Sequence, residues 1–100
     1  MSSITVTVGG ELFPVEIEAI DAETTARIAA DLGLSVEVIV AKVLQGQADE
    51  IDRHEVVALQ VASLIQSDEP ADHRWLLRRM TVGTVCEVVA SVELPDEVPA

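Results

Sequence analysis

Few residues of this sequence combine the types and the spacing that catalysis requires. His54 has Asp52 and Glu55 beside it, but the second histidine does not stand at the spacing of a zinc-binding helix. The single cysteine, Cys86, has no histidine nearby to activate it, and its apolar neighbours are typical of a small buried side chain. The eighteen Asp and Glu residues are scattered, so no acid–base pair can be selected. These patterns predict a protein that is not an enzyme and that holds no metal or cofactor.

One cluster differs from this background, the stretch HRWLLRR from His73 to Arg79. It holds three of the six basic residues and the only tryptophan. On a helix Arg79 follows Trp75 by one turn, which allows a cation–π contact. Two interpretations are open. In the first, the arginines pair with the acidic surface and Trp75 lies in the core. In the second the cluster binds a partner, because Trp and Arg are frequent interface anchors. The residues of that surface would be Arg74, Trp75, Arg78 and Arg79.

The composition limits the class of protein. One hundred residues suffice for one domain, and a hydrophobic content of 49% excludes a disordered acidic tail. The formal net charge of −12 argues against binding to nucleic acids or anionic membranes, and it favours a basic protein partner. The chain has neither the roughly 20 apolar residues of a membrane span nor the basic start of a signal peptide. We therefore expect a cytoplasmic protein with one domain over residues 1–100.

Residues 3–18 predict a β-hairpin. Apolar and polar residues alternate on both sides of Gly9-Gly10, a pair typical of a two-residue turn. This turn sets a register that pairs Val8 with Glu11, Val6 with Phe13 and Ile4 with Val15. The apolar residues then share one face: Ile4, Val6, Val8, Phe13, Val15 and Ile17. Pro14 cannot donate a hydrogen bond, so its strand should lie at an edge of the sheet.

Helical patterns follow, over residues 22–32, 36–45, 53–66 and from Pro70 to about Met80. The expected N-caps of the first three are Asp21, Ser35 and Asp52, the last in a capping box with Glu55. Gly33 should end the first helix in the left-handed conformation. The third helix contains an uncharged stretch, residues 56–67, that is apolar on nearly all sides. Such a helix is usually buried from several directions, so we expect it at the centre of the fold.

Residues 82–94 fit two patterns. Their valines favour a strand by propensity, whereas the helical neighbours and a cap at Thr81 favour a helix, and we prefer the helix. The predicted fold is α+β: an N-terminal β-hairpin packed on a small bundle of four to five helices. The helical part spans residues 22–94, and residues 95–100 form a flexible tail.

Three stretches together resemble a known family. They are VGGELFPV at residues 8–15, LGLS at residues 32–35 and VVALQVA at residues 56–62. Their order and the layout of residues 4–80 resemble the tail assembly chaperones of long-tailed, siphovirus-type phages. The chain departs from the family at Gln60-Val61, where an aromatic residue is usual. Abundant Ala and Val with a single lysine suit a GC-rich genome, such as that of a phage with an actinobacterial host.

The resemblance implies a non-enzymatic role. Such a chaperone binds the tape measure protein, keeps it soluble in the host cytoplasm, helps to recruit the tail tube protein and is absent from the finished particle. Association of identical copies is left open. The alternative is a small acidic interaction module or inhibitor, either an anti-defence protein or a nucleic-acid mimic, that acts on a host protein.

Overall fold

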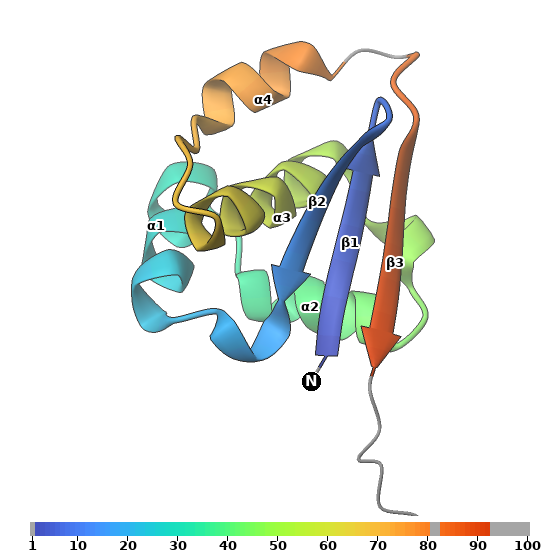
Figure 1. The fold of residues 1–100 in the computed structure, drawn as a ribbon, viewed down its shortest axis with the longest axis horizontal. Helices are drawn as coiled ribbons and strands as arrows, with labels where there is room; N and C mark the ends of the chain where they lie inside the picture. The colour runs from blue at the N-terminus through green and yellow to red at the C-terminus, as the bar shows by residue number, and fades with distance from the viewer. Residues whose placement is uncertain (1, 81–82, 93–100) are drawn as a thin grey trace, which may run out of the picture.

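The computed structural model describes residues 2–80 and 83–92, and its fold is α+β, as the sequence predicts. Within these residues three strands form an antiparallel sheet in the order β2-β1-β3 (Figure 1). In this view α2 and α3 cross behind the sheet, α1 lies to the left beyond the β2 edge, and α4 lies near the β1–β2 turn. The bounds are β1 Ser2–Val8, β2 Glu11–Glu16, α1 Ala22–Leu32, α2 Val36–Leu44, α3 Arg53–Gln66, α4 His73–Arg79 and β3 Cys86–Val92.

The N-terminal hairpin has the predicted register, in which Val8 faces Glu11 across the turn. Gly9 and Gly10 have φ angles of 56° and 88°, a conformation that glycine adopts without steric cost. The apolar residues that face the helices are almost completely buried: Ile4, Val6, Phe13 and Val15. Ile17 packs against this core from a short 3₁₀ turn rather than from the strand. β2 is an edge strand, as Pro14 predicted.

The prediction of a helix over residues 82–94 is wrong. Residues 86–92 form β3, which pairs with β1 along its whole length, from Val8 opposite Cys86 to Ser2 opposite Val92. Every second residue of β1 has backbone groups that point away from β2, and β3 supplies their hydrogen-bond partners. That requirement, added to the strand propensity of the valines, outweighs the helical pattern. Residues 81–82 and 93–100, and with them the Thr81 cap and the tail, lie outside the described residues.

Helix α3 is the centre of the fold, as predicted. All its residues from Glu55 to Ser63 are buried, and it lies against the sheet on one side and against α1 and α4 on others. Leu59 and Val57 are completely inaccessible to solvent. Gln60 is buried as well, and its Oε1 has no hydrogen-bond partner among the described residues. The burial of consecutive residues explains why no face of this helix carries a charge along its middle.

The helix ends follow local capping rules. The predicted caps at Asp21, Ser35 and Asp52 are all confirmed, and Asp52 and Glu55 form the complete capping box. Gly33 ends α1 with a φ of 70°, in the left-handed region.

Helix α4 begins later than predicted, at His73 rather than at Pro70. The carboxylate of Asp72 accepts hydrogen bonds from the backbone N–H groups of Arg74 (3.0 Å) and Trp75 (3.3 Å). An aspartate in this position satisfies donors that the first helical turn leaves open. The start of α4 is therefore determined by Asp72 and not by the proline.

The Asp21 cap makes the stability of α1 depend on pH. The hydrogen bond from the Thr24 N–H holds the pKa of the Asp21 carboxyl below its ordinary value. Such a carboxylate stabilises the fold above its unfolded pKa, and this stabilisation is lost as the pH falls through the folded pKa. Asp21→Asn keeps the acceptor but does not titrate, so the variant should lose less stability on acidification. Urea unfolding from neutral to acid pH measures this, and equal losses in both proteins would contradict the role.

Candidate protein-binding groove

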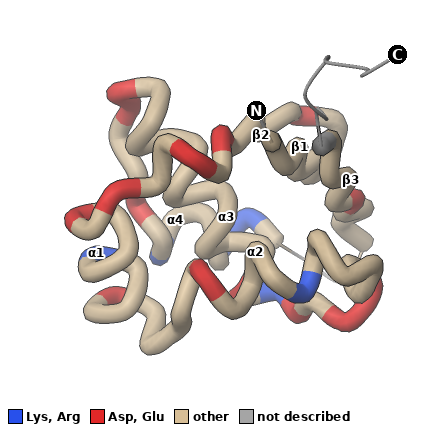
Figure 2. Tube along the Cα trace, turned by 90° about the horizontal axis from the view of Figure 1, so that it is seen from below, with Lys and Arg blue, Asp and Glu red and all other residues tan. Residues whose placement is uncertain are grey.

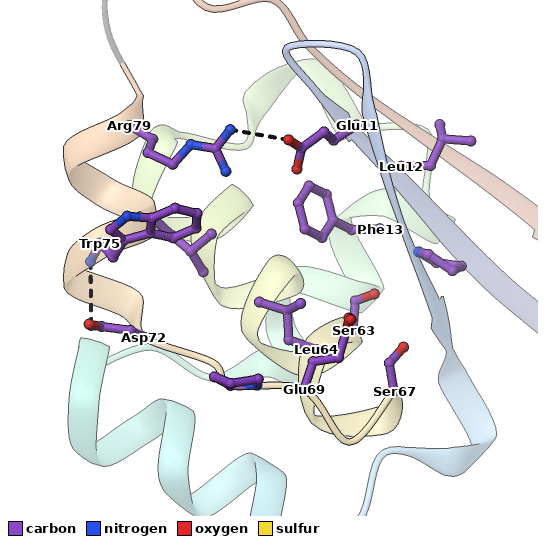
Figure 3. A pocket seen from close by; sticks show the side chains of 13 residues that line it. Glu11, Leu12, Phe13, Ser63, Leu64, Ser67, Glu69, Asp72, Trp75 and Arg79 are labelled. Carbon is purple, nitrogen blue, oxygen red and sulfur yellow. Dashed lines mark hydrogen bonds and ion pairs between the residues drawn. The ribbon is translucent and has the colours of Figure 1, made fainter.

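An open groove of about 730 Å³ lies between β2, the C-terminal half of α3 and α4 (Figure 3). The groove is present because α4 packs on α3 through the buried side chain of Leu76, whereas β2 does not cover the neighbouring face of α4. Phe13 of β2 and Leu64 of α3 form the opposite wall. The groove thus presents an apolar surface bordered by three separate elements.

Trp75 stands on the α4 side of this groove and is 48% exposed. In Figure 3 its ring faces Phe13 across the opening. The interpretation of Trp75 as a core residue is therefore wrong, because half of the largest side chain in the protein contacts solvent. Leu12, at the rim on the far side of β2, is 67% exposed. Of these two side chains only Trp75 faces the opening, because Leu12 points to the other face of β2.

Arg79 spans the groove at the end nearest the hairpin turn. Its guanidinium carbon lies 4.5 Å from the centre of the Trp75 ring, so the predicted cation–π contact is confirmed. The same guanidinium donates a hydrogen bond to Glu11 of β2, at 3.2 Å. Both partners of that ion pair are about half exposed, so it adds at most about 1 kcal/mol to stability. The guanidinium thus links the indole ring of α4 to β2 across the groove.

The other predicted residues of the cluster do not face the groove. Arg74 and Arg78 are exposed on α4, and Arg74 borders a different hollow, beside Ala71 and His73. The structure therefore brings Trp75 and Arg79 together and separates the remaining two arginines from them.

The rim of the groove is acidic. Among the described residues, the carboxylates of Glu11, Glu69 and Asp72 line it together with one guanidinium, that of Arg79. Figure 2 shows Asp and Glu spread over the helices and loops, in keeping with the formal net charge of −12. A partner with basic side chains beside an apolar strip would complement this surface.

The residues considered for chemistry lie apart from one another. His54 is exposed in the first turn of α3. Cys86 is exposed at the start of β3, which corrects the expectation of a buried side chain, and partial desolvation raises the pKa of its thiol. Within residues 2–80 and 83–92, no three His, Cys, Asp or Glu side chains gather as metal ligands would. None of the helices in that part of the chain is long and apolar enough to cross a membrane.

Leu12, Phe13 and Leu64 were not recognised as groove residues from the sequence. The hairpin register did contain one indication, because it places Leu12 on the face opposite Phe13, where a leucine has no core to enter. No protein-family model, curated protein or solved structure matches the chain. The groove and the resemblance are therefore the basis for a functional proposal.

Proposed function

We propose that this chain is a non-enzymatic tail assembly chaperone of a long-tailed phage, and that its groove holds an apolar helical segment of the tape measure protein. The observation that carries the proposal is the exposure of Trp75 beside an open groove whose opposite wall contains Phe13 and Leu64. Burying such side chains on a client would remove apolar surface from water in both proteins, which stabilises a complex. The proposal places this interaction in the cytoplasm of the infected cell, before the tail is complete.

The shape of the groove suits a helical client. An α-helix presents apolar side chains along one face at intervals of three and four residues, and such a strip docks into an apolar groove. Basic residues flanking the strip would meet Glu11, Glu69 and Asp72 at the rim. The acidic surface outside the groove would keep the complex soluble. The tail tube protein, the second partner of the proposal, would join later.

The alternative of a nucleic-acid mimic receives less support. A mimic needs carboxylates arrayed along one face, at the positions of phosphates. In Figure 2 the acidic residues are distributed over several helices and loops instead.

Trp75→Ala should abolish most of the client binding while changing the melting temperature little. A half-exposed indole at an interface centre typically contributes about 2 kcal/mol or more to binding, roughly thirty-fold in affinity. The test is co-expression with the tape measure protein of the same phage genome, with the soluble fraction of the tape measure protein as the readout. Leu44→Ala is the matched control, because Leu44 is 45% exposed on α2, away from the groove.

The possible results separate two questions. If the wild-type chain does not raise the soluble fraction, the chaperone proposal fails. If it does, and Trp75→Ala performs as well as Leu44→Ala, the client binds elsewhere and the groove assignment is wrong.

A further inference from the structure

The two edge strands of the sheet, β2 and β3, differ in whether their outward-pointing backbone groups are protected. At the β2 edge, Pro14 has no N–H to offer a further strand. The side-chain amide of Gln66 occupies the next outward position: it donates to the Glu16 carbonyl (2.8 Å) and accepts from the Glu16 N–H (2.9 Å). This amide reproduces the two hydrogen bonds that a neighbouring strand would make. The β2 edge is therefore closed to strand addition.

The β3 edge has no such protection among the described residues. The Gly9 N–H donates to the Val85 carbonyl at 3.0 Å, which shows that odd-numbered residues of this segment direct their backbone groups toward β1. The even-numbered residues, Cys86, Val88 and Ala90, then direct theirs outward. No hydrogen bond from another described segment reaches these groups. The strand contains no proline and a single charge, Glu87, and Val89 on its solvent face is 52% exposed.

We propose that the β3 edge pairs with the β3 edge of a second copy of this chain, antiparallel and about a two-fold axis at Val89. Val89 is the midpoint of the seven-residue strand, so this register pairs the strand along its whole length. It places Val89 opposite Val89, Val88 opposite Ala90 and Glu87 opposite Ser91. The two three-stranded sheets become one six-stranded sheet.

Self-complementarity is the argument for a second copy as the occupant. Two chains with a formal charge of −12 each repel one another, so self-association requires a surface on which carboxylates do not meet. In the proposed register each Glu87 faces a serine and not its own copy, and the rest of the strand is neutral. The same patch on both chains is self-complementary, as a two-fold interface requires.

The proposed dimer does not depend on the chaperone role, because it follows from the sheet edges alone. It would leave the groove open, since β2, which borders the groove, is the other edge strand of the sheet (Figure 1). Each dimer would then carry two grooves, and a long client with repeated helical segments could occupy both, with the gain in affinity that linked sites give.

A disulfide between the two copies tests the register. Residues whose backbone groups point away from the partner strand, as those of Val89 do, lie about 4.5 Å apart between Cα atoms when they face each other, which a disulfide can span. Under oxidising conditions, Cys86→Ser/Val89→Cys should form a covalent dimer, seen as a doubled mass on a non-reducing gel. The wild-type thiols would lie about 20 Å apart, six residue positions along the pair, and should not cross-link.

The matched control is Cys86→Ser/Val38→Cys, with Val38 54% exposed on α2. Equal cross-linking of both variants, or none in either, overturns the proposed register.

Sedimentation velocity tests the association itself. The wild-type chain should double its mass as concentration rises, and added salt should strengthen the dimer by screening the repulsion between copies. Ala90→Pro removes an outward-pointing N–H from β3, just as Pro14 offers none on β2. Val89→Asp places two carboxylates on the two-fold axis. Both variants should therefore remain monomeric. Val38→Asp should dimerise like the wild type. Circular dichroism identifies any variant that fails to fold. A wild-type chain that stays monomeric at high concentration and high salt overturns the proposal.

Discussion

Leu59→Ala is expected to lower the free energy of unfolding by about 3 kcal/mol, within the range for such a truncation in a core. Leu59 is completely buried at the middle of α3, the helix against which the sheet, α1 and α4 all lie. The truncation removes buried methyl groups and leaves a cavity whose walls belong to several elements, so the site cannot collapse easily. For a domain of this size the melting temperature should fall by roughly 12 to 24 °C.

Urea unfolding measured by circular dichroism gives the free energy, and an unchanged m value shows that the same surface unfolds. The control is Leu12→Ala, which removes the same atoms from a side chain that is 67% exposed. That substitution should change the free energy of unfolding by no more than about 0.5 kcal/mol. If the two variants lose similar stability, α3 is not the centre on which the fold depends.

The elements that were predicted correctly are those determined by nearby residues. The hairpin depends on Gly9-Gly10 and on alternation within six residues on either side. The start of α3 depends on Asp52 and Glu55, which lie three positions apart and satisfy each other's backbone groups. A capping box and a two-residue turn each contain their own hydrogen-bond partners. Such signals can be interpreted without knowledge of the rest of the chain.

Strand β3 could not be predicted in this way. Residues 82–94 fit the helical and the strand periods nearly equally, so the local pattern decides nothing. The deciding partner is β1, and its Ser2 lies opposite Val92 at the other end of the described chain. Only the need of β1 for hydrogen bonds on its second side selects the strand. The exposure of Cys86 follows from the same pairing, because it places this residue at the start of an edge strand.

For a related reason, only some of the residues that line the groove could be identified from the sequence. The unusual composition of residues 73–79 identified Trp75 and Arg79, and helical spacing predicted their contact. The wall opposite them is formed by β2, and the Arg79–Glu11 bond joins residues 68 positions apart. No local pattern specifies which face of a seven-residue helix turns toward a distant strand. For that reason helical spacing could not show that Arg74 and Arg78 do not line the groove.

The only lysine of the chain should contribute more to stability than a surface charge does. The Lys42 ammonium of α2 lies 3.0 Å from Glu55 Oε2, and Glu55 Oε1 accepts the Asp52 N–H at 3.2 Å in the capping box. The Glu55 side chain is 9% exposed and that of Lys42 is 35% exposed. Glu55 is thus a nearly buried carboxylate, and its counter-charge, the Lys42 ammonium, extends to it from the protein surface. This ion pair joins α2 to the start of α3.

Lys42→Met should lower the free energy of unfolding by about 2 kcal/mol, less than for a fully buried pair because water reaches the lysine side. The loss arises from the carboxylate that remains buried without its counter-charge, and it should therefore shrink when that charge is removed too. Glu55→Gln keeps the acceptor for the Asp52 N–H and so preserves the capping box. We expect Lys42→Met/Glu55→Gln to be more stable than Lys42→Met alone, by about 1 kcal/mol. Urea unfolding of all four proteins in a double-mutant cycle measures this coupling. If the losses in free energy of unfolding of the two single variants simply add, the ion pair contributes nothing beyond its separate side chains. The capping box would then be the only contribution of Glu55 to stability.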